Sequence, residues 1–366
     1  MSEIALTDQF TQPLTQPPLR WYFDPEILEL EQRVLFDRGP RYVGHELLVP
    51  NPGDYHVLDW MDGAKILVHN KNGVELLSNI CRHRQATMLE GRGSAMNIVC
   101  PVHRWTYQLD GKMMGAPRFS HNPCLHLDKS PLQSWNGMQF ASIRDIDRDL
   151  ANMPALSELD FSGYMLDRVE TVEYDFNWKT FIEVYQEDYH VAPFHPGLGK
   201  FVNCDDLNWK FGEWYSLQTV GINHALSKAG SSTYDKWHEQ VLRYHSAAMP
   251  RYGAIWLTYY PNVMVEWYPG TLVISSIIPR GATACTNVVE FYYLEDIVLF
   301  ERDFVAAEKA AYHETAKEDD IICRKMNQGR KSLYQRGIND AGPYQSPTED
   351  GLLHFHEFLQ RQLTPT

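Results

Sequence analysis

Cys81-Arg82-His83 and Cys100-Pro101-Val102-His103 are the two runs that decide the fold of this 366-residue chain, and sixteen residues separate His83 from Cys100. Each run offers one thiolate and one imidazole from a tight turn. Two such turns facing each other can hold a two-iron, two-sulfur cluster, with both cysteines on one iron and both histidines on the other. We therefore predict that Cys81, His83, Cys100 and His103 bind a [2Fe–2S] cluster.

This ligand set is that of a Rieske centre. Its imidazoles raise the potential above that of an all-cysteine cluster, so the centre can pass single electrons to an oxygen-activating metal. Zinc and chance spacing are the alternatives. A structural zinc site usually shows Cys-x2–4-Cys followed by His-x3–5-His, which is a different pattern.

Composition is that of a soluble globular protein, and the net charge of −14 argues against nucleic acid as a partner. No run of eighteen apolar residues predicts a membrane span, and residues 1–14 lack the basic and apolar regions of a secretory signal peptide. The cysteines outside the two runs, at positions 124, 204, 285 and 323, show no paired spacing. Free thiols beside an iron–sulfur centre predict a cytoplasmic location.

Basic side chains surround the two cluster runs although the chain is acidic. They are Arg82, Arg84, Arg92, Arg104, Lys112 and Arg118. They form either a solvated surface with donors that stabilise the cluster or a docking patch for an acidic electron donor.

The first part of the chain has the pattern of a small antiparallel β domain that carries the cluster on two loops. Short strands such as Lys65–His69 and Gln139–Ile143 lie between frequent Gly, Asp and Pro residues over 40–145. A helix is expected over Pro25–Phe36, because Pro is favourable at a helix start. The charged segment Arg144–Leu159 suits a linker.

The second part predicts an α+β domain. A helix is expected over Trp178–Tyr189, strands over Asn262–Trp267 and Val288–Tyr293, and a long helical stretch over Asp296–Leu333. Strands followed by a long packing helix indicate a sheet with one face covered.

A second metal site is suggested by His190 and His195, five residues apart around Pro193. Two neutral imidazoles and one carboxylate form the facial triad that binds non-haem Fe(II) and leaves positions open for oxygen. A histidine pair at this spacing is also compatible with structural histidines, so the pair alone does not decide between the two interpretations.

The motif order resembles the catalytic α subunit of Rieske non-haem iron oxygenases over nearly the whole chain. It runs Cys-x-His, sixteen residues, Cys-x2-His, then Asn-Trp-Lys-x7-Glu-x2-His-x4-His from Asn177 to His195. The tail, with Glu318-Asp319-Asp320, Gly329-Arg330 and 351–356, is similar to the carnitine and choline monooxygenase branch. Gln85 departs from the family pattern, because a Gly often follows the Arg in the first cluster loop.

The resemblance implies the remaining site residues. In that branch a Glu-Asp pair stands ten residues before the Gly, and counting back from Gly329 makes Asp319 the third iron ligand, with Asp320 as the competitor. A solvated acidic helix face is the alternative for this segment. Glu187 matches the carboxylate that bridges an iron histidine to a cluster histidine of the neighbouring subunit, a role that needs an acceptor for two imidazoles. Asp188, next to it, is expected at the surface or behind the site.

The fold class that the resemblance implies is α+β. It comprises an N-terminal Rieske antiparallel β domain and a C-terminal helix-grip (START-like) catalytic domain with a curved antiparallel sheet. Three domains are expected. Residues 1–38 form a segment that packs on the catalytic domain, residues 39–150 form the Rieske domain, and residues 151–366 form the catalytic domain. The implied assembly is a homotrimer closed by head-to-tail contacts.

The implied reaction is oxygen activation at a mononuclear Fe(II), giving hydroxylation or oxidative demethylation of a small organic substrate. Electrons would come from NAD(P)H through a separate flavin reductase or a ferredoxin, because the chain has no Gly-rich dinucleotide fingerprint. The candidate pocket residues are Trp209, Trp214, Tyr215, Trp256, Tyr259, Tyr260, Glu266 and Trp267. They suit a quaternary ammonium group by cation–π contact or an aromatic acid by stacking, and many could be core aromatics. A Rieske electron carrier and a zinc-stabilised binding module are the other possible classes.

Overall fold

A computed structural model describes residues 16–223, 226, 228–246 and 249–363. Two compact units can be distinguished: Gly39–Asp147, and the remainder of the chain on either side of it. Within the described residues, no helix combines the length and the apolar composition that crossing a bilayer requires.

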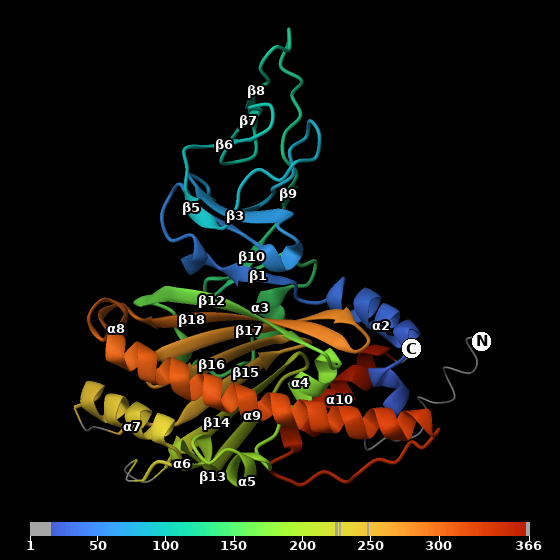
Figure 1. The fold of residues 1–366 in the computed structure, drawn as a ribbon, viewed down its shortest axis with the longest axis vertical. Coiled ribbons are helices and arrows are strands. Elements are labelled where there is room, and N and C mark those ends of the chain that lie inside the picture. Colours follow the sequence, from blue (N-terminus) through green and yellow to red (C-terminus); the bar gives the residue numbers. More distant parts are fainter. Residues whose placement is uncertain (1–15, 224–225, 227, 247–248, 364–366) are drawn as a thin grey trace. The chain divides into compact units, whose positions relative to one another are not determined.

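The unit of residues 39–147 consists of three small antiparallel sheets (Figure 1). Their strand orders are β5-β2-β3-β4-β9, β6-β7-β8 and β1-β11-β10. The strands are β1 (Tyr42–His45), β2 (Asp54–Val57), β3 (Lys65–Asn70), β4 (Gly73–Ser78), β5 (Arg92–Ser94), β6 (Asn97–Val99), β7 (Thr106–Gln108), β8 (Met113–Gly115), β9 (Lys129–Ser130), β10 (Gln133–Trp135) and β11 (Met138–Phe140). Ile66, Val68, Ile98 and Tyr107 belong to the core of this unit, which also contains Cys81 and Cys100.

The other unit is built on one antiparallel sheet of seven strands in the order β12-β18-β17-β16-β15-β14-β13. The strands are β12 (Tyr164–Tyr174), β13 (Val202–Phe211), β14 (Tyr215–Ile222), β15 (Ala254–Tyr259), β16 (Val263–Tyr268), β17 (Thr271–Gly281) and β18 (Ala284–Leu294). The helices of the chain are α2 (Pro25–Glu31), α3 (Ile146–Leu150), α4 (Trp178–Tyr185), α5 (Val191–Phe194), α6 (Leu198–Phe201), α7 (Ser232–Tyr244), α8 (Glu295–Phe300), α9 (Arg302–Gln335) and α10 (Asp350–Leu363).

Helix α9 lies along the sheet and covers one of its faces (Figure 1). Phe304 and Ala311 of α9 share a buried cluster with Val273 of β17 and with Val289 and Phe291 of β18. A sheet with helices on one face is the predicted α+β architecture, and this prediction is confirmed.

Several predicted boundaries differ from the structure. The expected helix Pro25–Phe36 is α2 followed by a π-helical turn, Gln32–Phe36. The expected linker contains α3 and a 3-10 turn, Ser157–Leu159. The long helix is broken at Glu301 between α8 and α9, and α9 continues through Gly329, where an added Cβ would meet no neighbouring atom.

The Asn177-Trp178-Lys179 run joins α4 to α2. The Asn177 side chain accepts a hydrogen bond from the Lys179 amide and caps α4. Glu31 of α2 accepts from Trp178 Nε1 at 2.8 Å and from Lys179 Nζ at 2.6 Å, and both charged partners are fully buried. A buried ion pair is stable only when its hydrogen bonds are satisfied. The contact of α2 with α4 satisfies those of Glu31 and Lys179.

Candidate active site

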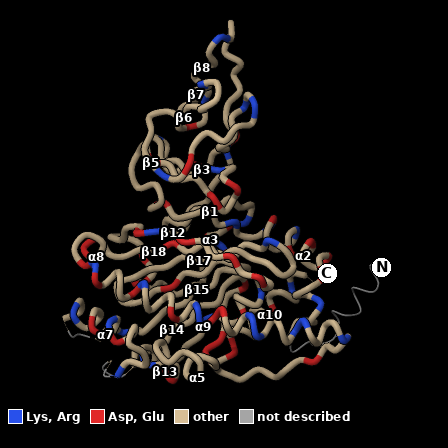
Figure 2. Tube along the Cα trace, viewed as in Figure 1, with Lys and Arg blue, Asp and Glu red and all other residues tan. Residues whose placement is uncertain are grey.

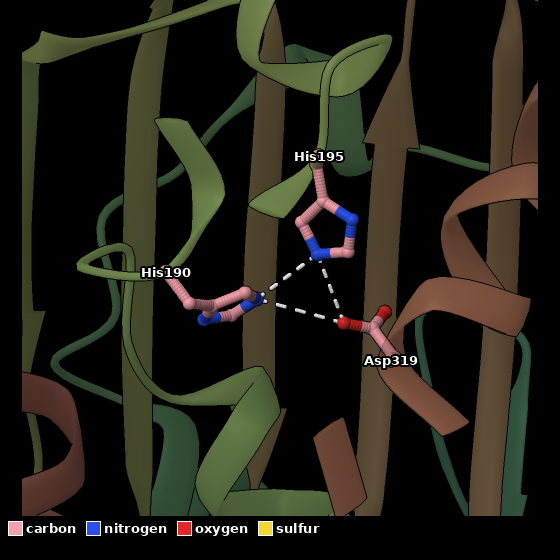
Figure 3. A group of neighbouring side chains, drawn as sticks. All are labelled: His190, His195 and Asp319. Carbon is pink, nitrogen blue, oxygen red and sulfur yellow. Dashed lines mark hydrogen bonds and ion pairs between the residues drawn. The ribbon is translucent and has the colours of Figure 1, made fainter. Parts of the chain in front are cut away.

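His190, His195 and Asp319 converge from two parts of the chain (Figure 3). The histidines flank the short helix α5, and Asp319 projects from α9. His195 Nε2 lies 3.0 Å from His190 Nε2 and 3.0 Å from Asp319 Oδ1, and His190 Nε2 lies 3.5 Å from the same oxygen. Three potential ligand atoms therefore face one point.

The spacing of these atoms fits a metal ion. Adjacent ligands on an octahedral ion, each about 2.1 Å from it, lie about 3.0 Å apart. Two nitrogens and one carboxylate oxygen are also the donor set of the facial triad, which leaves coordination positions open. The residues present thus suit a mononuclear iron.

A carboxylate behind each histidine orients its ring. His195 Nδ1 lies 2.7 Å from Glu318 Oε2, and His190 Nδ1 contacts Glu187 Oε1. A proton on each Nδ1 satisfies the carboxylate and leaves the Nε2 lone pair for a metal. The structure therefore favours the tautomer that metal binding needs.

The electrostatics also favour a cation between the three side chains. Burial lowers the pKa of His190, but hydrogen bonds to Asp319 and Glu187 outweigh it and raise this pKa to about 10. Burial also lowers the pKa of His195, but the Asp319 and Glu318 carboxylates outweigh burial. The pKa of His195 is therefore raised. Burial raises the pKa of Asp319, but the interactions with the two histidines outweigh burial, so the pKa of Asp319 is lowered overall. A divalent ion can replace the protons that these groups hold.

Asp319, and not Asp320, reaches the histidines. Asp320 Oδ2 accepts from Arg324 Nε at 2.9 Å, one turn further along α9. Because successive residues on a helix point about 100° apart, only one of the two adjacent carboxylates can face the histidine pair.

The predicted helix Trp178–Tyr189 is wrong at its end, because α4 ends at Tyr185. Gln186 leaves the helix and accepts from Ser216 Oγ at 2.6 Å on the sheet. Asp188 is buried and accepts from Gln218, so it does not lie at the surface. The Glu187 carboxylate contacts the His190 ring through Oε1, and its Oε2 accepts a hydrogen bond from the His190 backbone amide at 3.1 Å.

The two cluster runs form matching loops. The Arg104 amide donates to the Cys100 carbonyl at 3.0 Å, and the Gln85 amide donates to the Cys81 carbonyl at 3.1 Å. Gln85 and Arg104 both have a left-handed backbone, with φ of 56° and 60°. Gln85 therefore adopts the conformation for which Gly is usually favoured, at a cost of about 1 kcal/mol.

The side chains of these loops fit a two-iron cluster. His83 Nδ1 and His103 Nδ1 lie 3.2 Å apart, and two nitrogens held about 2.1 Å from one tetrahedral metal would lie about 3.4 Å apart. Cys81 and Cys100 are each 1% exposed. Tyr107 Oη lies 3.7 Å from Cys81 Sγ, so a hydroxyl is placed beside one thiolate.

The six basic residues predicted around the cluster runs are all exposed, and Figure 2 shows Lys and Arg spread over the loops of this unit. Arg82 forms an ion pair with the exposed Asp128 at 2.9 Å. Exposed basic side chains near an electron-transfer centre can attract an acidic protein partner.

A cavity of about 140 Å³ lies between the sheet and α9, beside the His190–His195–Asp319 group. This is small compared with pockets for drug-sized ligands. Aromatic and acidic side chains dominate its lining, and among the described lining residues there is no Lys or Arg. The acidic and histidine residues of the lining are Glu170, Glu187, Asp188, His190, His195, Glu266, Glu308, His313 and Asp319.

Of the predicted pocket residues, Trp256 and Glu266 line the cavity and the others do not. Trp214, for example, packs edge-on against Phe358. The sequence reasoning missed Tyr185, Tyr268 and Tyr312 in the lining, and it assigned no role to Glu318. The position of Glu318 directly before Asp319 was the one sequence feature that could have indicated its role. The tyrosines come from three separate elements, so no local pattern relates them.

Comparison with known proteins relates both units to described families. Residues 41–135 match the Rieske [2Fe-2S] domain, and residues 163–365 match the ring hydroxylating alpha subunit (catalytic domain). The chain is 59% identical to the putrescine 2-hydroxylase of Ralstonia nicotianae over 361 residues, which cover 99% of each chain. It is 49% identical to the putrescine 2-hydroxylase of Bordetella bronchiseptica over 381 residues, which cover 100% of this chain and 89% of that protein. A crystal structure of a quaternary ammonium Rieske monooxygenase superposes with a TM-score of 0.74 at 18% identity, covering 95% of each chain, which is a likeness of fold.

Proposed function

Because the chain belongs to the family of ring-hydroxylating oxygenase α subunits, we propose that it hydroxylates a carbon of a small linear diamine, with putrescine as the substrate. The chain is a Rieske-type oxygenase whose cofactors are a [2Fe–2S] cluster and a mononuclear iron, so the predicted enzyme class and cofactors are confirmed. Cys81, His83, Cys100 and His103 hold the cluster in this proposal. His190, His195 and Asp319 hold the iron.

The charge of the cavity lining supports an amine. An aromatic acid would need a basic partner, and none of the described lining residues is a Lys or an Arg. A cation would instead meet acidic and aromatic side chains, both of which stabilise ammonium groups. The identity to two putrescine 2-hydroxylases points to the same chemical class.

The side chains around the metal have separate roles in the reaction. Bound iron supplies the site of oxygen activation, and the cluster supplies an electron. Glu187 and Glu318 hold the Nδ1 protons of His190 and His195 and so orient both imidazoles. The apolar parts of the lining, such as Val184 and Leu198, exclude water from the reacting carbon.

A multicomponent oxygenase requires an electron donor, and we assign this role to an NAD(P)H-dependent flavin reductase or a ferredoxin that docks on the exposed basic residues. We also propose a homotrimer, in which Glu187 couples His190 to a cluster histidine of the neighbouring subunit. We also propose that the Rieske domain comprises residues 39–150 and that the domain boundaries therefore lie after residues 38 and 150.

Substrate-dependent consumption of oxygen and NAD(P)H with a surrogate reductase tests the proposed reaction. The panel contains putrescine, choline, carnitine and benzoate, and mass spectrometry follows the addition of one oxygen atom. Putrescine should give product in proportion to the oxygen consumed. Asp319→Ala serves as the control without iron. Coupled hydroxylation of benzoate and none of putrescine would contradict the proposal.

A further inference from the structure

Glu266 on β16 is a buried carboxylate that forms no ion pair with a cationic side chain among the described residues. It is 2% exposed and lines the cavity. Tyr268 Oη donates to Oε2 at 2.8 Å, and Tyr312 Oη donates to Oε1 at 3.3 Å. In the described part of the chain, no Lys, Arg or His forms an ion pair with it. Burial raises its pKa to about 7, although the neighbouring hydroxyls oppose this. A cation entering the cavity would therefore relieve an uncompensated buried charge.

Asn287 on β18 gives an independent indication of a ligand. This side chain lines the same cavity and is 3% exposed, and its Oδ1 has no hydrogen-bond partner among the residues that the structure describes. Buried acceptors are almost always satisfied, so an unpaired one that lines a cavity indicates a donor from outside the chain. A primary ammonium carries three N–H donors, whereas a trimethylammonium group carries none.

The spacing of Tyr312 and Asp319 along α9 agrees with a short diamine. Tyr312, which contacts Glu266, and Asp319 lie on the same face of α9, and their residue numbers place them about 10 Å apart along the helix axis. An extended chain of four methylene groups between two nitrogens spans about 6 Å from ordinary bond lengths. A hydrogen bond of about 3 Å to a carboxylate brings the total to about 9 Å. One end of such a molecule can thus reach Glu266 while a carbon near its other end faces the metal ligands.

We propose that Glu266 is the specificity-determining residue that accepts the terminal ammonium of a linear primary diamine. This inference rests on the proposed amine hydroxylation and adds the selection of the primary ammonium and of the chain length. Tyr268 and Tyr312 hold the carboxylate in place through their hydroxyls. Trp256, whose Nε1 donates to Tyr268 Oη at 3.0 Å, completes the aromatic wall behind the ammonium. Methylated ammonium groups lack the N–H that the carboxylate requires, so choline should bind poorly.

The first test measures putrescine binding and turnover in Glu266→Gln, with both cofactors loaded. Glutamine keeps the shape but removes the charge. The Kd from anaerobic calorimetry and the KM should rise about 10- to 100-fold, as expected for loss of a charge-assisted hydrogen bond, while kcat changes much less. Glu290→Gln is the matched control, because Glu290 is also buried, also accepts from a tyrosine (Tyr292) and lies on the same sheet outside the cavity lining.

The second test uses Glu266→Asp, which retains the charge but withdraws the carboxylate by one methylene. The preferred substrate should lengthen from 1,4-diaminobutane to 1,5-diaminopentane, measured as a reversal of the kcat/KM ratio for the two amines. A merely structural role of Glu266 would lower kcat/KM for both amines equally, and that result would overturn the proposal. Unchanged putrescine affinity in Glu266→Gln would overturn it as well.

The calorimetric arm separates this inference from the proposed reaction. If the wild-type enzyme binds putrescine but oxidises none of it, the proposed function fails, and loss of binding in Glu266→Gln still supports the ammonium site. If the wild-type enzyme hydroxylates putrescine and Glu266→Gln does so with the same KM, the reaction stands and the ammonium site fails. Absence of both binding and turnover in the wild-type protein overturns both.

Discussion

Replacing Glu318 by Ala should weaken iron binding without removing an iron ligand. Glu318 Oε2 lies 2.7 Å from His195 Nδ1, and His195 is 1% exposed. The substitution leaves a buried N–H without its acceptor, which costs about 1–3 kcal/mol. It also frees the ring to rotate and to change tautomer, so the Nε2 lone pair no longer points constantly at the metal position.

The magnitude can be estimated in a second way. Loss of a carboxylate behind a metal-binding histidine typically lowers metal affinity about 10- to 100-fold. At 1.36 kcal/mol for each factor of ten, this is about 1.4–2.7 kcal/mol. The two ranges overlap, so we expect the Kd for iron to rise by one to two orders of magnitude in Glu318→Ala. Glu318→Gln should recover part of the loss, because its amide oxygen can still accept from Nδ1.

Competition with a chelator of known affinity measures this Kd, and the visible spectrum of the cluster in the same sample reports that the protein is intact. Asp320→Ala is the matched control, since Asp320 is an acidic residue of the same helix that pairs with Arg324. An iron affinity of Glu318→Ala equal to that of the wild-type and control proteins would refute the assigned role of the His195–Glu318 contact.

Four other outcomes follow from the site. Asp319→Ala should lose about one iron per chain with the cluster spectrum intact, and the reverse result in Asp320→Ala would move the ligand by one residue. Cys100→Ser should abolish the Rieske visible and low-temperature spin-resonance signals, and their survival would exclude this cysteine as a ligand. Glu187→Gln should keep both centres loaded yet lower product formation by orders of magnitude in single-turnover kinetics with pre-reduced enzyme. If the variant oxidises its cluster at the wild-type rate with substrate and oxygen present, Glu187 has no part in the mechanism. Burial raises the pKa of Glu266 from 4.5 to about 7, so the native state binds more protons than the unfolded state between these values and the free energy of unfolding falls as pH rises through this window. Glu266→Gln should therefore lose less thermal stability than wild type between about pH 5 and 7 in the absence of amine, and parallel Tm curves would contradict the assigned pKa.

The candidate cluster ligands could be proposed from sequence because their chemistry is local. Each run places its Cys and His two or three residues apart, so a single tight turn brings a thiolate and an imidazole together. The family and the fold class followed from the order of these runs along the chain, and both are confirmed. Sequence also indicated Asp319, although only through the spacing to Gly329, and it left Asp320 open.

The end of α4 illustrates what local propensity cannot show. Nothing between Trp178 and Tyr189 forbids a helix, and the chain leaves the helix at Gln186 because Gln186 and Asp188 bond to Ser216 and Gln218 of the sheet. These partners lie some thirty residues away, and their contacts outweigh the weak preference of the segment for a helix.

The sequence by itself determined which chemical groups this protein carries and in what order, because thiolates, imidazoles and carboxylates act through their identity and short spacing. Only the tertiary structure decided which side chains line one cavity. Glu266 comes from β16, Asn287 from β18, and Tyr312 and Asp319 from α9, and no periodicity along the chain relates them. Their shared cavity exists because the seven-stranded sheet packs against one long helix. Burial within it leaves the Glu266 carboxylate without a counter-charge from the described residues.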